Sequence, residues 1–374
     1  HDRAAWPLRS HAQNASWISI GLSDTSSRLE RGFQSLTRGF YEGLSRWREH
    51  SRIGAAAFSQ YDRMLQRFPA LAEQPDQRRP VAANHIQNGL LRLGYSMETM
   101  TRIRGSGLPV ISTFYMGSLA AERHTDLPVY SLICDVEFSR AWVPSRPKGS
   151  RIEYLAPTAR SAERLMAYGV SGSRVHVTGF PLPLENVGDR NRDILLEDWR
   201  RRARRLADPT CPLTLLFCIG GAGVQASAAR SLLDRMGDAI DAGSVRLWIS
   251  AGVSTLAAER IRPALRPEWL ESDRVRLIHE HDKPAYFQQF SQALHETDLV
   301  ITKPSEMVFY AGLGLPILLT DPVGYHESLN AAWLLETGAG DRLPPDFDLD
   351  RIREMQSDGR LLDWGCRGLQ TGLG

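Results

Sequence analysis

The sequence predicts an α/β protein with two domains. Short apolar segments alternate with helical segments in both halves of the chain, a pattern typical of parallel sheets covered by helices on both faces. A length of 374 residues is comfortable for two cores of ordinary size. A segment rich in Pro, Gly and charged residues separates the two halves. These observations indicate one α/β domain on either side of that segment.

The predicted strands fall into two groups. Those of the first half are residues 108–113, 128–134, 151–155 and 175–178, with a helix at 158–168. Those of the second half are residues 213–219, 245–250, 275–279, 299–302 and 316–320, with a helix at 226–236. We therefore expect a parallel sheet in each domain.

The boundary between the domains is predicted near residues 179–192 (GFPLPLENVGDRNR). We expect an N-terminal domain over residues 1–183 and a C-terminal domain over residues 184–345. After residue 343 a Pro-Pro step leads into a predicted helix at 349–355. Residues 346–374 are therefore interpreted as a helical tail.

The composition is that of a globular protein, with 42% hydrophobic and 24% charged residues. The sequence has no run of eighteen apolar residues and no start that reads as a signal peptide, so we expect a cytoplasmic location. The four cysteines lack the spacing of a metal site, and Cys134 and Cys218 lie in apolar strands as expected of buried thiols. The formal charge of +2 gives no indication of a nucleic-acid partner.

Two Arg-rich segments are open to two interpretations each. Residues 28–48 place aromatic and Leu side chains on one helical face and Arg on the other. Such a helix either packs on the core with a solvated basic face or lies on an anionic membrane. The cluster in residues 200–205 is likewise either a charged helix face or a patch for lipid headgroups.

A glycine-rich turn follows the predicted strand at 213–219. Its residues are Gly220, Gly221, Ala222 and Gly223, and a helix follows. Backbone amides in such a turn can approach a phosphate, and the helix dipole favours the anion. The alternative is that the glycines serve tight packing only. Gln225 stands where a dinucleotide fingerprint would need its third glycine, so the turn does not match that motif.

A second group of polar residues lies in ITKPSEMVFYAGLGLPILLTDPVGYHESLN, residues 301–330. Ser305 can cap the helix that follows, and Lys303 and Glu306 stand beside it. Glu327 and Asn330 are three residues apart and share a helix face. Both polar loops and the glycine-rich turn follow strands, and ligands of open α/β sheets bind at that edge. Capping and turn formation explain several of these residues without a ligand.

Together, TKPSE and GLGLPILLTDPVGYHESLNAAWLLETGAG resemble the donor-binding region of family 28 glycosyltransferases. In the first half, PVISTFYMGSLAA, LPVYSLICDVEFSRAWVP and YLAPTARSAERLMAYGVSGSRVHVTGFPLP follow the layout of the same family. The resemblance covers residues 108–345 and is greatest to the monogalactosyl- and glucosyl-diacylglycerol synthases. It lies in the order of the motifs.

The resemblance implies a GT-B fold, with two Rossmann-like domains and a cleft between them. It implies a nucleotide-diphosphate sugar donor, UDP-sugar favoured, and a lipid acceptor at the inner face of the membrane. Gly221 to Gly223 would face the diphosphate. The residues expected beside the diphosphate, the ribose or the sugar are Lys303, Ser305, Glu306, His326, Glu327 and Asn330. His279 begins the loop that would hold the base.

The same resemblance makes Asp135 the interdomain acidic residue and a candidate general base, with His11 as the other candidate. The expected reaction is an inverting displacement at the anomeric carbon by an acceptor hydroxyl. Backbone amides and helix N-termini would stabilise the leaving diphosphate, so no metal is required.

The sequence also departs from the family, and two alternatives stay open. The KPSE turn is shorter than the family's glycine-rich turn, and Phe114 and Arg140 stand where the family commonly has His. These departures favour a non-catalytic GT-B scaffold. A sugar-nucleotide 2-epimerase shares the fold and is the third possibility.

Overall fold

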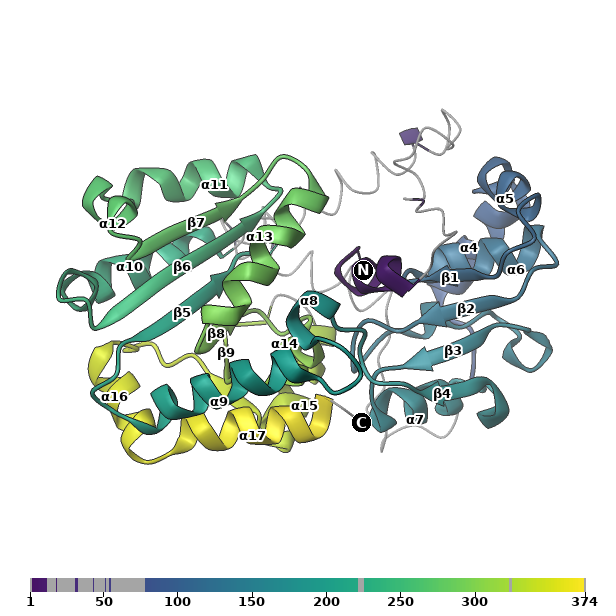
Figure 1. Cartoon of the computed structure of the whole chain (residues 1–374). Coiled ribbons are helices and arrows are strands. Elements are labelled where there is room, and N and C mark those ends of the chain that lie inside the picture. Colours follow the sequence, from purple (N-terminus) through teal and green to yellow (C-terminus); the bar gives the residue numbers. More distant parts are fainter. Residues whose placement is uncertain are drawn as a thin grey trace. The chain divides into compact units, whose positions relative to one another are not determined.

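The structure is a computed structural model that describes residues 2–11, 18, 31–32, 43, 51, 54, 78–220, 225–322 and 325–372. The chain divides into two units (Figure 1). Unit 1 comprises His1–Pro181 and Gly324–His326, and unit 2 comprises Leu182–Val323 and Glu327–Leu373. Each unit contains one parallel sheet with helices around it, which confirms the predicted α/β class.

Unit 1 contains a four-stranded parallel sheet in the order β1-β2-β3-β4. Its strands are β1 Val110–Ser112, β2 Val129–Leu132, β3 Glu153–Ala156 and β4 Val175–Val177. Its helices are α1 Asp2–Ala5, η1 Trp6–His11, α4 Ala82–Arg92, α5 Met97–Arg104, α6 Tyr115–His124, η2 Arg140–Trp142, η3 Pro147–Gly149, α7 Ala159–Ala167 and η4 Gly172–Arg174. The four predicted strands and the predicted helix at 158–168 are confirmed, with strands somewhat shorter than expected.

Unit 2 contains a six-stranded parallel sheet in the order β10-β9-β8-β5-β6-β7. Its strands are β5 Leu213–Cys218, β6 Val245–Gly252, β7 Val275–His279, β8 Leu299–Thr302, β9 Ile317–Leu319 and β10 Gly340–Arg342. Its helices are α8 Leu184–Val187, α9 Asp193–Ala207, α10 Ala226–Asp241, α11 Thr255–Ile261, η5 Arg262–Ala264, α12 Pro267–Glu271, α13 Lys283–Glu296, α14 Met307–Gly312, α15 Tyr325–Thr337, α16 Leu349–Ser357 and α17 Arg360–Gly372.

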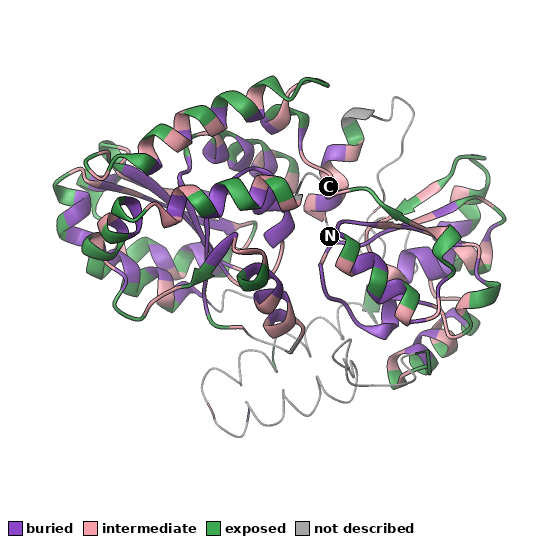
Figure 2. Cartoon of the chain, turned by 90° about the horizontal axis from the view of Figure 1, so that it is seen from below, coloured by how far each residue is buried: buried purple, intermediate pink, exposed green. Residues whose placement is uncertain are grey.

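All five strands predicted in the second half are present. The strand β10 was not predicted, because its residues Gly-Asp-Arg include no apolar side chain and it occupies the edge of the sheet. Every residue of β5 is buried, as expected for a central parallel strand. Figure 2 shows the strands of unit 2 buried inside helices whose outward sides are exposed.

The order of the strands in unit 2 creates a topological switch point. From β5 the chain moves outward through β6 to β7, and α13 then returns it to β8 on the other side of β5. The next strands, β9 and β10, continue outward in the opposite direction. The loops after β5 and β8 therefore leave neighbouring strands toward opposite sides, and in open α/β sheets ligands bind at this point.

The C-terminal helices pack on unit 2. Helix α17 contacts α9 and α14, and α16 contacts α9 (Figure 1). Two glycines of α17 permit the close approach: a Cβ atom added at Gly365 would lie 2.6 Å from the ring of Trp199, and one added at Gly368 would lie 3.0 Å from the carbonyl oxygen of Ala311. A side chain at Gly368 would therefore separate α17 from α14, and the close contact between the two helices requires glycine there.

The arginines of α9 correct the prediction of a solvated basic face. Arg202 is 2% exposed and donates hydrogen bonds to the carbonyl oxygens of Thr297, Leu313 and Leu294. Burial lowers the pKa of Arg202 to about 10, so the side chain remains charged at neutral pH. The prediction was wrong for Arg202 because backbone carbonyl oxygens that face the helix can accept hydrogen bonds from a buried cation.

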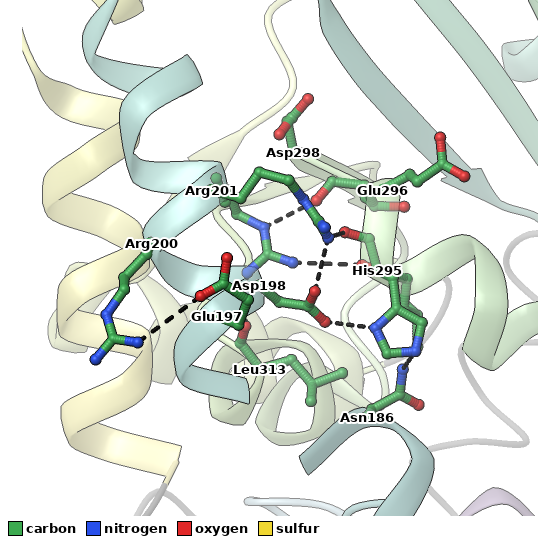
Figure 3. A network of polar contacts seen from close by, with 12 residues as sticks. Asn186, Glu197, Asp198, Arg200, Arg201, His295, Glu296, Asp298 and Leu313 are labelled. Carbon is green, nitrogen blue, oxygen red and sulfur yellow. Dashed lines mark hydrogen bonds and ion pairs between the residues drawn. The ribbon is translucent and has the colours of Figure 1, made fainter. Parts of the chain in front are cut away.

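The neighbouring arginines are partly or fully exposed. Arg201 pairs with Asp198 at 2.6 Å, and Asp198 also accepts a hydrogen bond from His295 at 2.5 Å (Figure 3). Arg200 lies 3.8 Å from Glu197 in a solvated pair. The predicted helix at 28–48 lies outside the described residues except for residues 31, 32 and 43.

Replacing Arg202 by Met should lower the free energy of unfolding by about 3 kcal/mol, because the buried carbonyl oxygens lose their donors and the nearby carboxylates their counter-charge. In thermal unfolding followed by circular dichroism, we expect a melting point about 6–12 °C lower. Arg204→Met, at an exposed position of the same helix, is the control and should change stability by less than about 0.5 kcal/mol. Equal effects of the two substitutions would contradict the assigned role of Arg202.

Candidate functional site

Two loops meet at the switch point of unit 2. Gly220 lies two residues after β5, and Lys303 directly follows β8. A Cβ atom added at Gly220 would lie 3.1 Å from Cε of Lys303. The glycine therefore leaves the space through which the Lys303 side chain passes. The structure brings together two of the residues that the sequence singled out separately.

Lys303 forms an ion pair with Glu327, a residue in the first turn of α15. The Lys303 Nζ atom lies 2.5 Å from Oε1 of Glu327. The side chain of Glu327 is 2% exposed and that of Lys303 is 29% exposed, so the carboxylate is buried and the lysine side chain is partly exposed. The buried carboxylate fixes the position of the ammonium group, which carries three donors.

Asn330 contacts the same turn from α15. Its Nδ2 atom donates a hydrogen bond to the carbonyl oxygen of Pro304 at 3.3 Å, and the residue is 1% exposed. Glu327 and Asn330 therefore share one helix face, as predicted, and both brace the turn after β8. His326 precedes Glu327 in the first turn of α15 and is partly exposed.

The turn after β5 begins with a side-chain contact. The amide of Gly220 donates to Oε1 of Gln225 at 3.0 Å, and Gln225 is the N-cap residue of α10. This bond links the start of the turn to the start of the helix. Gly221, Ala222 and Gly223 lie outside the described residues, so their contact with a phosphate stays a prediction.

The prediction that Ser305 caps α14 is wrong. Glu306 is the N-cap residue and makes no side-chain capping hydrogen bond there, while the amide of Ser305 donates to the carbonyl oxygen of Lys303 at 2.6 Å. Glu306 adopts a left-handed conformation with φ of 55°. This conformation costs a non-glycine residue about 1–3 kcal/mol, and such strained residues cluster at ligand sites. The tight turn at Ser305 shifted the helix start by one residue.

His279 lies apart from this group. It ends β7, which is three strands from β8 and therefore about 14 Å away. Its ring centroid lies 5.4 Å from that of His281, and the next residue, Asp282, caps α13 by accepting from the amide of Ala285 at 2.9 Å. Burial, followed by the charges of His281 and Arg262, lowers the pKa of His279.

In unit 1, Asp135 follows β2 at the carboxyl edge of its sheet and is partly exposed. The loop that carries it is fixed by Glu137, which is 1% exposed and accepts hydrogen bonds from Arg160 at 2.6 Å and Arg164 at 2.7 Å. This network was not predicted from the sequence. The spacing of Arg160 and Arg164, four residues apart on a predicted helix, was the available signal.

Arg140, which stands where the resembling family commonly has His, has a structural role. It is 1% exposed and donates to the carbonyl oxygens of Val143 at 2.6 Å and Pro144 at 3.0 Å. Phe114 precedes α6, and its ring packs 4.3 Å from that of Tyr115. His11 ends η1 and its side chain is not described, so its role as a base stays a prediction.

Two further properties bear on the kind of site. Within the described ranges, no group of three or more His, Cys, Asp or Glu side chains is arranged to hold a metal ion. None of the helices in the described part of the chain has the length and apolar content needed to cross a bilayer.

Comparison with known proteins gives a fold-level likeness. The profile of a domain family of unknown function, DUF6938, matches residues 190–366. No protein of curated function matches the sequence. Among solved structures, the UDP-GlcNAc 2-epimerase from Neisseria meningitidis bound to UDP-GlcNAc is 12% identical and aligns over 81% of this chain and 78% of its own, with a TM-score of 0.41.

The glycosyltransferase SnogD from Streptomyces nogalater is 14% identical, with 80% of this chain and 78% of its own covered and a TM-score of 0.44. MnaA of S. aureus, solved with UDP, is 13% identical over 82% of this chain and 75% of its own, with a TM-score of 0.44. These similarities are weak, and the interpretation of the site rests on its own residues.

Acidification should destabilise the protein in part through His279. The pKa of His279 is lower in the folded chain than its ordinary value of 6.5, so the unfolded chain binds a proton more readily as the pH falls through that value. We expect His279→Gln to lose less thermal stability than the wild type between pH 7.5 and pH 5.5. Melting points measured at both pH values test this, with the pH 7.5 values as the reference. An unchanged or larger loss in the variant would contradict it.

Proposed function

We propose that unit 2 binds the diphosphate of a sugar nucleotide, with a UDP-sugar favoured, at the carboxyl ends of β5 and β8. The observation that carries this proposal is the ammonium group of Lys303, held at the switch point by the buried Glu327 beside the glycine turn. A fixed cation next to a glycine-rich strand–helix turn suits an extended anion. The ammonium group of Lys303 carries a positive charge and three hydrogen-bond donors, the groups that bind a phosphate oxygen.

The rest of the donor fits along the same edge of the sheet. Glu306, in its left-handed turn, and Ser305 are proposed to face the ribose or the diphosphate, and His326 the sugar. The loop from His279 to Lys283 is proposed to hold the base. Its distance from β8, about 14 Å across three strands, would extend the nucleotide over the carboxyl edge.

We further propose an inverting transfer of a hexose to a lipid hydroxyl, such as that of diacylglycerol. The hydroxyl oxygen attacks the anomeric carbon, and the bond from that carbon to the diphosphate oxygen breaks. The electron pair stays on the diphosphate, next to Lys303 and the turn amides, without a need for a metal. The hydroxyl proton passes to Asp135 or His11. The fixed loop around Asp135 supports Asp135 as the base, because a base must be held within hydrogen-bond reach of the proton it accepts.

Substitution of Lys303 by Met should weaken binding of UDP about 10- to 100-fold, because hydrogen bonds from a charged donor contribute about 1.5–3 kcal/mol. Isothermal titration calorimetry with UDP measures this directly. Lys148→Met, at an exposed lysine of unit 1, is the matched control and should bind UDP like the wild type. If the wild type binds no UDP, the proposed function is overturned.

Asp135→Asn should lower turnover about 100-fold or more and leave UDP binding unchanged, because it removes a proton acceptor without touching the donor site. Release of UDP from UDP-glucose or UDP-galactose, with and without diacylglycerol, is the measurement. Asp234→Asn, on the exposed side of α10, is the control. UDP binding without turnover would favour a scaffold, and conversion of a UDP-sugar without acceptor would favour an epimerase.

A further inference from the structure

The strand β7 forms one edge of the sheet of unit 2 (Figure 1). It pairs with β6 alone, so the opposite side of the strand has no neighbour in the described sheet. The other edge strands of the two sheets, β1, β4 and β10, have three residues each, whereas β7 has five. The longest edge strand of the described chain is therefore open to a further strand.

The pairing with β6 identifies the backbone groups that face outward. The carbonyl oxygen of Arg274 accepts a hydrogen bond from the amide of Leu247 in β6. Successive residues of a strand direct their backbone groups to opposite sides, so every second residue from Arg274 onward also faces β6. The outward-facing residues are Val275, Leu277 and His279, and no strand of the described chain pairs with their backbone groups.

A cavity of about 430 Å³ borders β7 and leaves room beside it. Its lining comes from β7 itself and from the segment between residues 262 and 273, which includes η5 and α12. Leu265, Leu270 and Leu277 give the cavity apolar walls, and Leu270 is 46% exposed. The helices next to β7 therefore do not fill this space, and covering its apolar walls would be favourable.

The arginine within β7 does not block this edge. Charged side chains on edge strands commonly prevent pairing with another chain. In β7, however, the guanidinium carbon of Arg276 lies 4.0 Å from the ring centroid of Trp248 on β6. The same guanidinium group donates to both carboxylate oxygens of Asp273, at 3.0 Å and 2.6 Å. These contacts hold the charge over the neighbouring strand and neutralise it.

Two copies of β7 complement each other when they run antiparallel. With Leu277 opposite Leu277, Val275 stands opposite His279, and each of these pairs joins residues whose backbone groups face outward. This is the one symmetric register that pairs all five residues of the strand. Arg274 and Glu280, which flank β7, then stand opposite each other at both ends. Opposite charges in this position stabilise neighbouring strands.

Neither Arg274 nor Glu280 has an ion-pair partner in the described chain. Arg274 donates to the backbone carbonyl oxygen of Asp241, and Glu280 accepts a hydrogen bond from the side-chain amide of Gln289. Both residues are partly exposed. Pairing between two copies would supply each of them with the counter-charge that it lacks. The charge pattern therefore favours a second copy of this chain over an unrelated strand.

We propose that β7 pairs antiparallel with β7 of a second copy of the chain and joins the two six-stranded sheets into one. Leu277 lies on the two-fold axis, and a pair of Arg274 with Glu280 lies on either side of it. The same surface is used by both copies, as in most symmetric dimers. The inference goes beyond the proposed function, and because the pairing needs no nucleotide, either proposal can fail without the other.

Sedimentation velocity of the full chain without nucleotide tests the proposal. We expect the wild type to change from one chain to two as its concentration rises through about 1–100 μM. Arg274→Glu should weaken this association about tenfold or more, because like charges then face each other at both ends. Arg230→Glu, at an exposed position of α10, is the matched control and should associate like the wild type. A wild type that stays a single chain throughout overturns the proposal.

Mixing two variants separates a contact between copies from a loss of folding. Arg274→Glu leaves only acidic side chains at positions 274 and 280, and Glu280→Arg leaves only basic ones. Each variant alone should associate weakly, whereas an equimolar mixture should form mixed dimers about as strongly as the wild type. A mixture that associates no better than its components would contradict the proposed register.

A cysteine on the two-fold axis tests the register directly. Residues in a hydrogen-bonded antiparallel pair have Cα atoms about 5.5 Å apart, a separation that a disulfide can span. Leu277→Cys, in a chain whose exposed Cys366 is changed to Ser, should form a disulfide between copies in oxidised glutathione. Leu256→Cys in the same background, exposed on α11, should not. A folded Leu277→Cys chain that dimerises without this disulfide would assign the dimer to another surface.

Discussion

The pairing of β5 with β8 is the constraint on which the proposed donor site depends. At the amino ends of these strands, Asp298 accepts a hydrogen bond from the amide of Thr214 at 2.9 Å, and its own amide donates to the Thr214 carbonyl oxygen at 2.8 Å. Burial raises the pKa of Asp298, while Arg205, bound at 2.8 Å, acts in the opposite direction. At the carboxyl ends, the same two strands deliver Gly220 and Lys303. These contacts between Asp298 and Thr214 fix how β5 pairs with β8, and the pairing determines where Gly220 and Lys303 lie at the other ends of the two strands.

Arg202 extends this constraint to the neighbouring loops. Its guanidinium group holds the carbonyl oxygens of Leu294 and Thr297 just before β8, and that of Leu313 just before β9. The loops after β8 and β9 start from strands whose beginnings are tied to one buried cation. Unit 2 therefore buries one arginine, Arg202, inside the fold, whereas Lys303 at the carboxyl edge pairs with Glu327 and has a partly exposed side chain.

The strands other than β10 could be predicted from the sequence, because each is a short apolar run between turn residues, and central strands such as β5 and β8 are buried throughout. β10 could not, since an edge strand of three residues needs only backbone pairing. The burial of Arg202 could not be predicted either, because its partners are backbone carbonyl groups more than ninety residues away. The left-handed turn at Glu306 was missed because nothing in Ser-Glu-Met specifies it.

In the candidate site, the polar loops that follow strands could be predicted from the sequence. Which of their residues lie close together could be predicted only in part. Glu327 and Asn330 share a helix face, which spacing alone reveals. The contact of Gly220 with Lys303 depends on the strand order, and the order follows from how α13 crosses the sheet. His279 could not be placed in this way: it is the last residue of β7, and the strand order puts β7 at the edge of the sheet, three strands from β8.

The glycine contacts of α17 have a consequence for biosynthesis. The helix packs against α14, which starts directly after the turn that carries Lys303 and Glu306, and Gly368 lies against the backbone of Ala311 in that helix. Because α17 is the last helix of the described chain, the ribosome releases it after every strand of the sheet has emerged. During translation, the helix α14 beside the proposed diphosphate site is therefore covered by α17 only after all strands of the sheet have been made, and a nascent chain that still lacks α17 leaves that side of α14 uncovered.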